Sequence, residues 1–218
     1  MKKIIFTDNE YINDIYIKVA LPTLITSKCH NDCEFCKVKK EKDLSDESYF
    51  LQLKEILENT DIDKKILLTG ESTICRKRFI QTVQICKEYG FDVIINTTGK
   101  GLSYIYLDKP LSQYLIGSIS KIIINRMAIE QNENNKIFHG ENITKEQIED
   151  YIFFFKMNDI KIEIASEIFK NTTLNDVLDF VEFYHNLGCE TISFDVIDEC
   201  NINFDVKYKN MSIVTETL

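Results

Sequence analysis

The sequence predicts an α/β fold of parallel strands, because short apolar runs alternate with stretches of helical period along most of the chain. Six such runs read as strands, which fits a partial (β/α)6 barrel or an open doubly wound sheet. Two prolines and seven glycines leave little room for long linkers. In both architectures ligands bind at the carboxyl ends of the strands. Functional residues are therefore expected in the loops that follow the strands.

The first half of the chain predicts three strands and two helices. The strands are expected within 15–25, 64–70 and 91–99, where apolar and β-branched residues predominate. A helix is expected at 45–59, which opens with Ser and Asp as cap candidates and then repeats apolar residues on one face. A second helix at 77–90 ends at a glycine.

The second half continues the same alternation. Strands are expected at 119–125, 160–166 and 190–198. The helix expected at 144–158 begins with the Thr and Gln of a capping box, and the one at 173–188 ends at a glycine. This order of elements predicts right-handed crossovers between neighbouring parallel strands. We therefore expect one domain over residues 1–200 and a short C-terminal tail over 201–218.

Composition and charge narrow the classes of partner. The net charge of −9 is spread along the chain, which argues against general nucleic-acid binding, since such binding rests on clustered Lys and Arg. No run approaches 18 apolar residues, so a membrane span is not expected. The N-terminus turns acidic too soon for a signal peptide, and a cytoplasmic location is expected. In a reducing compartment, the seven cysteines are expected to be thiols or metal ligands rather than disulfides.

Three of these cysteines, Cys29, Cys33 and Cys36, lie within eight residues of one another in the loop that leaves the first predicted strand. Incidental thiols are one interpretation. Structural zinc is a second, with His30, Cys189 or Cys200 as the fourth ligand that zinc normally needs. An iron–sulfur cube is a third: cubes usually have four thiolates, so three would leave one iron open to another molecule.

The cysteine spacing resembles the C-x3-C-x2-C signature of the radical S-adenosylmethionine (SAM) enzymes, with Phe35 as the aromatic residue before the last cysteine. Three further stretches resemble motifs of that family. Residues 66–74 are similar to the second-strand motif, with Thr69 for a glycine and Ser72 for a proline, and residues 93–101 are similar to the end of the third strand. Residues 122–138 resemble a fourth-strand pattern. The resemblance covers about residues 15–200 and implies the partial (β/α)6 barrel.

The resemblance also implies cofactors and residue roles. Cys29, Cys33 and Cys36 would hold a [4Fe-4S] cluster whose fourth iron binds SAM. SAM itself would be contacted by Phe35 near the adenine, by the Thr69, Gly70 and Glu71 loop at the methionine amine, and by the fourth-strand residues Asn125 and Arg126, the latter at the carboxylate.

Further residues are candidates for the site or the core by their position in the predicted elements. Thr97 and Thr98 end the third predicted strand and could meet SAM or cap a turn. Glu163 and Ser166 lie on the fifth strand, and spacing alone does not say which of them faces inward. The remaining cysteines are scattered; Cys86 fits a helix core, and Cys75 is close enough to the second-strand loop to lie near SAM. No auxiliary cluster is expected.

The leading hypothesis is a radical SAM enzyme, an oxidoreductase, transferase or lyase acting on a peptide or small molecule. The alternative is a non-catalytic zinc- or iron–sulfur-binding interaction module. Lysines within 37–42 follow the last cluster cysteine, and they suggest that an acidic flavodoxin or ferredoxin docks there as electron donor. The reaction and the substrate itself are not readable from the sequence.

Overall fold

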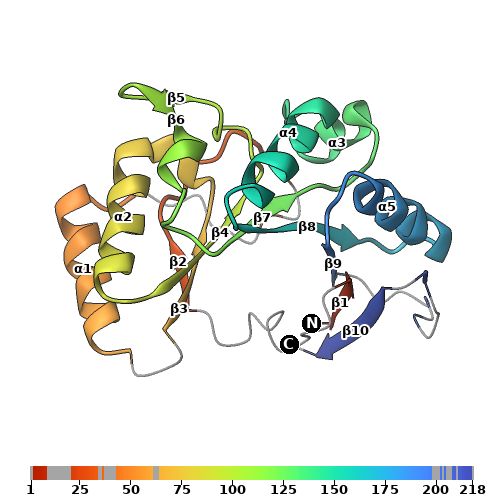
Figure 1. Ribbon diagram of the computed structural model, residues 1–218, viewed down its shortest axis with the longest axis horizontal. Coiled ribbons are helices and arrows are strands. Elements are labelled where there is room, and N and C mark those ends of the chain that lie inside the picture. The colour runs from red at the N-terminus through yellow and green to blue at the C-terminus, as the bar shows by residue number, and fades with distance from the viewer. Residues whose placement is uncertain are drawn as a thin grey trace.

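The computed structural model describes residues 2–8, 21–33, 36, 43–60, 64–197, 202, 204, 208–209 and 211–217. Its centre is an eight-stranded sheet with the order β10-β1-β9-β8-β7-β4-β3-β2, and helices cover its outer face (Figure 1). The strands of this sheet are β1 (Lys2–Thr7), β2 (Leu21–Leu24), β3 (Lys65–Thr69), β4 (Asp92–Thr97), β7 (Lys121–Asn125), β8 (Lys161–Ile168), β9 (Thr191–Val196) and β10 (Ser212–Thr217).

The six strands from β2 to β9 are parallel and correspond one to one to the six predicted strands. The prediction of a partial barrel of parallel strands is thus confirmed. The crossovers run through helices, except between β4 and β7. There the chain forms a small hairpin and a 3₁₀ helix: β5 (Ile105–Tyr106), β6 (Lys109–Pro110) and η4 (Leu111–Tyr114). Sequence reasoning did not identify this hairpin, because two-residue strands carry no periodic pattern.

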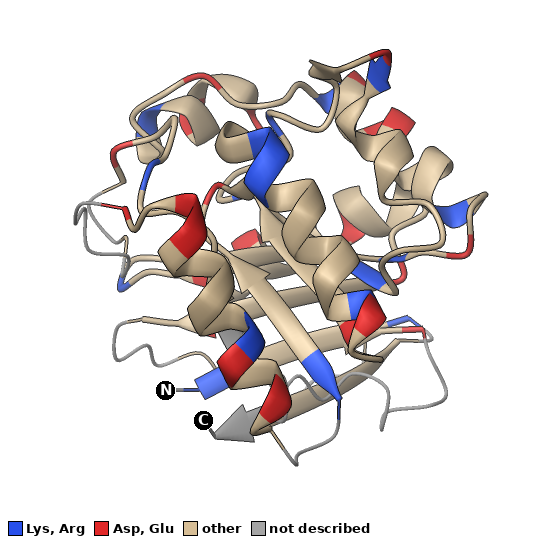
Figure 2. Ribbon diagram, turned by 90° about the vertical axis from the view of Figure 1, so that its left-hand side faces the viewer, with Lys and Arg blue, Asp and Glu red and all other residues tan. Residues whose placement is uncertain are grey.

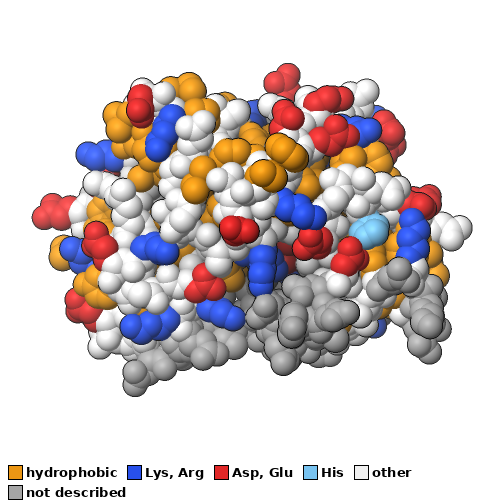
Figure 3. All heavy atoms as spheres, viewed as in Figure 1, with side chains coloured by type: hydrophobic (Ala, Val, Ile, Leu, Met, Phe, Trp, Pro, Cys, Tyr) orange, Lys and Arg blue, Asp and Glu red, His pale blue; other side chains and the backbone are white. Residues whose placement is uncertain are grey.

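The described residues form five α-helices, and three of these begin with a side chain that accepts a hydrogen bond from a first-turn backbone amide. The five helices are α1 (Asp46–Glu58), α2 (Arg76–Glu88), α3 (Gln131–Ile137), α4 (Lys145–Lys156) and α5 (Leu174–Asn186). Ser45 accepts a hydrogen bond from the Ser48 amide at the start of α1, and α4 opens with the expected capping box. None of the described helices is long and apolar enough to cross a membrane. Acidic and basic residues are interspersed over the described surface (Figures 2 and 3).

Two strands at the ends of the chain were not predicted. β1 lies between β9 and β10 and is antiparallel to both, so residues near the two ends of the chain share one side of the sheet (Figure 1). β10 falls within 201–218, which was expected to be a tail, and it pairs with β1 at the edge of the sheet. The apolar run in β1 is only Ile4, Ile5 and Phe6, too short to stand out as a strand without its distant partners.

The floor of the barrel contains a buried group of charged residues. The Glu163 carboxylate, 1% exposed, forms ion pairs with Lys121 at 2.5 Å and Lys3 at 3.2 Å and accepts a hydrogen bond from Ser193. Burial raises the pKa of Glu163, but the two lysines and the hydroxyl outweigh it and hold the pKa below its usual range. Glu163 thus belongs to the structural floor, which corrects the suggestion that it could meet SAM.

Candidate functional site

A cavity of about 620 Å³ opens at the carboxyl ends of the parallel strands. Its wall includes all three clustered cysteines, the loop after β3, the end of β4 and single residues from β7, β8 and β9. Parallel strands direct their carboxyl ends to one side of the sheet, which is why segments far apart in sequence meet here. The fold therefore brings together most of the residues singled out in the sequence.

The three thiols line one side of this cavity. Cys29 and Cys36 are exposed and Cys33 is half-buried. The Asn31 amide donates to the Cys29 sulfur at 3.4 Å, and the Cys33 thiol donates to the Phe138 carbonyl at 3.6 Å. Partial burial, and after it the negative charges of Cys29 and Cys36, raise the pKa of Cys33 to about 11. Thiolates that repel one another in this way are stabilised when they bind a cation.

The donor set fits an iron–sulfur cube. Among the described residues, no three His, Cys, Asp or Glu side chains surround one point as ligands of a single metal ion would. In a cube each cysteine binds a different iron, so the thiols need only converge on a common space. Cys29, Cys33 and Cys36 do so, because all three face the same cavity.

Both ends of the cysteine loop are clamped. Asp43 accepts hydrogen bonds from the Thr26 hydroxyl at 2.6 Å and from the Ser27 amide at 2.8 Å, joining residues on either side of the loop. Burial raises the pKa of Asp43, but these hydrogen bonds outweigh it and leave the pKa below its ordinary value. The segment that carries the cysteines is thus attached to the fold at its entry and exit.

Arg78 of α2 makes a second clamp. Its guanidinium, 8% exposed, donates to the Ile25 carbonyl at 3.1 Å and to the Leu44 carbonyl at 2.7 Å, one on each side of the cysteine loop. It also contacts the Asp46 carboxylate at the start of α1. The fixed fork of the guanidinium suits this simultaneous contact with several oxygens.

The loop after β3 forms the next part of the wall. Thr69, Gly70 and Glu71 all line the cavity, as the family resemblance implies. Gly70 has φ +82°, a conformation that residues with a Cβ rarely adopt. The carbonyls of Thr69, Gly70 and Glu71 accept hydrogen bonds from Ile25, Ser72 and Ile74 respectively. The Ser72 hydroxyl also reaches the Thr69 and Gly70 carbonyls, at 3.5 and 3.4 Å, and with one hydrogen it can donate fully to only one of them. Since a carbonyl oxygen has two lone pairs, the loop keeps capacity for a further donor.

The ends of β4 and β7 complete this side of the cavity. Thr97 and Thr98 line it and bind the Glu71 carboxylate through their hydroxyls at 3.0 and 2.6 Å. Asn125 lines it as well, and its amide group donates to the Asn96 side chain at 2.5 Å and to the Thr97 carbonyl at 3.3 Å. These contacts join neighbouring strand ends into one connected rim.

Arg126 differs from expectation. Side chains alternate along a strand, so Asn125 faces the cavity and Arg126 points to the opposite face of the sheet. Its guanidinium, 1% exposed, donates to the Tyr184 hydroxyl at 3.1 Å and to the Ile143 carbonyl at 2.7 Å. Arg126 does not line the cavity, and the expectation that it pairs with the SAM carboxylate is not met.

Some of the other expected residues lie away from the cavity wall. Ser166 is buried and Cys75 is half-buried at the end of the 3₁₀ helix η3 (Ser72–Cys75), and neither lines the cavity. Cys86 and Cys189 are fully buried, as Cys86 was predicted to be. Phe35, Cys200 and the lysines of 37–42 lie outside the described residues.

Several residues that line the cavity were not singled out in the sequence, among them Met127, Phe138, Glu167 and Asp195. Glu167 and Asp195 are register partners on β8 and β9. The period-two alternation of these strands could have suggested them, but only once the inward face was known. Phe138 follows α3, a helix of seven residues that carries no clear apolar periodicity.

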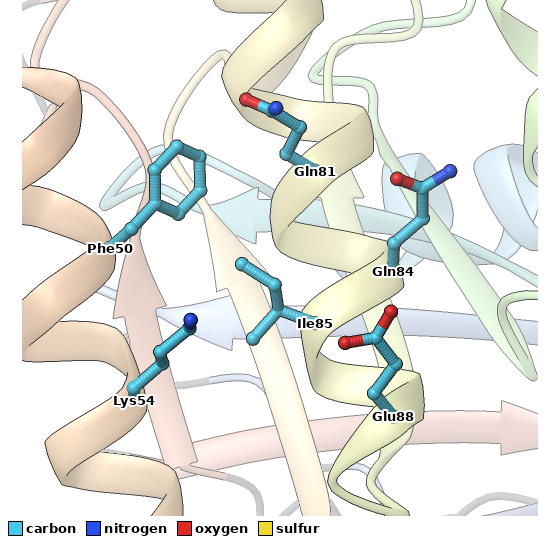
Figure 4. A pocket seen from close by; sticks show the side chains of 6 residues that line it. All are labelled: Phe50, Lys54, Gln81, Gln84, Ile85 and Glu88. Carbon is cyan, nitrogen blue, oxygen red and sulfur yellow. The ribbon is translucent and has the colours of Figure 1, made fainter.

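A second hollow of about 250 Å³ lies between α1 and α2 (Figure 4). It is lined by Phe50 and Lys54 of α1 and by four residues of α2, Gln81, Gln84, Ile85 and Glu88. No thiol and no strand end contributes to it. The chemistry suggested by the sequence is therefore confined to the larger cavity.

Comparison with known sequences gives one distant relative. No family model matches the chain. It is 23% identical over 187 residues to the GTP 3′,8-cyclase of Aquifex aeolicus (strain VF5), an alignment that covers 82% of this chain and 57% of the relative. The chain thus spans little more than half the length of the curated protein that it matches.

Comparison with solved structures gives closer agreement in fold than in sequence. SuiB of Streptococcus suis bound to SAM has a TM-score of 0.62 at 15% identity, covering 86% of this chain and 41% of SuiB. The radical SAM methyltransferase TsrM of Kitasatospora setae, bound to cobalamin and a [4Fe-4S] cluster, has a TM-score of 0.57 at 11% identity, covering 81% of this chain and 36% of TsrM.

Coproporphyrinogen III oxidase (HemN) of Escherichia coli, described as a radical SAM enzyme, has a TM-score of 0.58 at 12% identity, covering 88% of this chain and 49% of HemN. These proteins resemble this chain through the parallel barrel, at whose strand ends its cysteines and motif residues meet. The chain therefore has the fold of the radical SAM enzymes, as its cysteine motif indicates.

Proposed function

We propose that this chain is a radical SAM enzyme in which Cys29, Cys33 and Cys36 hold a [4Fe-4S] cluster beside a bound SAM. The observation that supports this most is the shared cavity: the three thiols and the Thr69, Gly70 and Glu71 loop line the same 620 Å³ space. When bound, the cluster supplies one electron to SAM, whose cleavage yields methionine and a 5′-deoxyadenosyl radical that takes a hydrogen atom from the substrate.

In this proposal, residues of the chain hold the cysteine loop in place, orient SAM and exclude water from the cavity. The clamps by Asp43 and Arg78 fix both ends of the cysteine loop. The carbonyls of the loop after β3 accept hydrogen bonds from the methionine amine, and Asn125, which lines the same cavity, offers a polar contact for the rest of SAM. Met127 and Phe138 supply apolar wall, which excludes water from a reactive intermediate.

The substrate is a peptide or a small molecule. The structure of SuiB bound to the precursor peptide SuiA, which this fold resembles with a TM-score of 0.59, favours a peptide. The structure of TsrM bound to its tryptophan substrate, at a TM-score of 0.54, supports a small molecule as the alternative. A flavodoxin or ferredoxin docking near the lysines of 37–42 supplies the electron.

The direct test is anaerobic reconstitution with iron and sulfide, followed by incubation with SAM and dithionite. We expect about four irons per chain, a brown colour and release of 5′-deoxyadenosine. A colourless protein that binds zinc and leaves SAM intact would establish the alternative, an interaction module. A brown protein that never cleaves SAM would leave a cluster-binding module without radical chemistry.

A further inference from the structure

The Glu71 carboxylate, in the cavity wall, accepts four hydrogen bonds. Glu71 is 4% exposed. One oxygen accepts from the Thr73 hydroxyl and from the Thr97 hydroxyl at 3.0 Å, and the other accepts from the Thr98 amide at 3.2 Å and the Thr98 hydroxyl at 2.6 Å. Four donors occupy the four acceptor directions that a carboxylate offers.

From this arrangement we infer that Glu71 is a positioning residue that joins the loop after β3 to the end of β4, while recognition of the SAM amine falls to the neighbouring backbone carbonyls. The inference rests on the proposed SAM site. The side chain of Glu71 fixes the conformation of the loop, and the carbonyls of Thr69, Gly70 and Glu71 bind the SAM amine.

The direction of the hydrogen bonds supports this assignment. Thr97 Oγ1 accepts a hydrogen bond from the Gly99 amide at 3.0 Å, so its own hydrogen is directed toward Glu71. The Thr98 amide can only donate. These two contacts therefore require an acceptor at Glu71, and together they tie the turn after β4 to the loop after β3.

Close packing against Gly101 fixes the position of Thr73, the donor to Glu71 from its own loop. A Cβ on Gly101 would stand 2.3 Å from the Thr73 Cβ, so the loop after β4 lies directly against Thr73. Thr73 is fully buried, and its hydroxyl meets the Glu71 carboxylate. The carboxylate is thus held from the side of β4 by Thr97 and Thr98 and from its own loop by Thr73.

The charge of Glu71 is balanced by neutral donors only. Within the described part of the chain, no Lys or Arg forms an ion pair with Glu71. Glutamine at this position keeps one acceptor oxygen for Thr98 and turns the amide group toward Thr73 and Thr97, whose hydroxyl hydrogens then lose their acceptor. Glu71→Gln therefore loosens the link between the loops while it conserves volume.

The test measures SAM affinity, iron content and thermal stability of the reconstituted protein for Glu71→Gln, Thr97→Val, Thr97→Ser and the double variant Glu71→Gln/Thr97→Val. We expect Glu71→Gln and Thr97→Val each to weaken SAM binding about tenfold with iron content unchanged, and Thr97→Ser, which keeps the hydroxyl, to bind as the wild type does. Since each of the two single changes already removes the Thr97–Glu71 hydrogen bond, the double variant should lose less affinity than the sum of the two single losses.

A matched control is Thr82→Val. Thr82 is also a fully buried threonine with hydrogen bonds, to the Arg78 carbonyl and Tyr49, but it lies in α2 away from the cavity. It should lower the melting temperature and leave SAM affinity unchanged. If Glu71→Gln behaves like Thr82→Val, or if the two losses of affinity add in the double variant, the positioning role is refuted. If the wild type binds no SAM, the proposed function fails instead.

Discussion

Gly70 lies directly against the backbone of Thr26: a Cβ on Gly70 would stand 2.6 Å from the Thr26 carbonyl oxygen and 2.9 Å from the Leu24 side chain. The loop after β3 therefore touches the segment that leads into the cysteine loop. The family resemblance implies that this loop contacts SAM. The structure adds a requirement within the protein itself, which links the two halves of the proposed site even before a ligand binds.

Substitution of Gly70 by Ala should destabilise the apo-protein by about 2–4 kcal/mol, because the new Cβ meets a backbone atom that cannot rotate away. Urea unfolding measures the change. Gly117 is the matched control: it also has a positive φ, +68°, but a Cβ there would have nothing within 4 Å. Gly117→Ala should cost only the conformational part, about 1–2 kcal/mol. Equal losses in the two variants would show that the Thr26 contact is unimportant.

Replacement of Cys29, Cys33 or Cys36 by Ala should each abolish cluster binding, because a cube held by three protein thiolates cannot spare one. We expect iron to fall from about four per chain to near zero, with loss of SAM cleavage. Cys75→Ala serves as control, since Cys75 does not line the cavity. Full iron content in any of the three cavity variants would mean that its sulfur is not a ligand.

Removing Arg78 should release the ends of the cysteine loop. Arg78→Met keeps much of the stem but loses the hydrogen bonds to the Ile25 and Leu44 carbonyls, so the reconstituted protein should lose iron to a chelator several times faster than the wild type. Arg76 lies two residues earlier in α2 and makes one hydrogen bond, to the Ile105 carbonyl. Arg76→Met should retain iron normally; a similar loss in both variants would contradict the clamp.

The buried ion pairs of Glu163 should make the free energy of unfolding depend on pH. Glu163→Gln removes the buried anion that Lys121 and Lys3 contact and should cost about 3–5 kcal/mol near neutral pH. The folded-state pKa of Glu163 is depressed, so its contribution is fully present above about pH 4.3, the unfolded value, and is lost as pH falls through the folded pKa.

Unfolding curves at several pH values check this expectation, and the gap between wild type and Glu163→Gln should narrow in acid. The control is Glu190→Gln. Its partner Lys156 is also close, at 2.6 Å, but both side chains are more than half exposed, so the cost should be below about 1 kcal/mol. A Glu163→Gln cost as small as this would mean that the buried pairs contribute little.

Periodic features of the chain were predictable from sequence, and features set by distant contacts were not. The capping box of α4 and the six parallel strands follow from local spacing. The orientation of Arg126 does not, because the residue adjacent to a cavity-lining Asn125 faces the other side of the strand and no local pattern says which is inward. Asp195 and β1 were missed for a related reason: their placement depends on pairing with residues at the far end of the chain.

The antiparallel insertion of β1 between β9 and β10 has a consequence for the order in which the protein folds. The parallel strands are joined by local crossovers and can assemble as the chain is synthesised from its N-terminus. β1 precedes its partners in the sequence, but Ile4 pairs with Phe194 and Thr215 and must wait for both. Contacts between such distant residues form late, since the loop that closes them is long. β1 is therefore among the last strands of the sheet to reach its place, although it comes before the other described strands in the sequence.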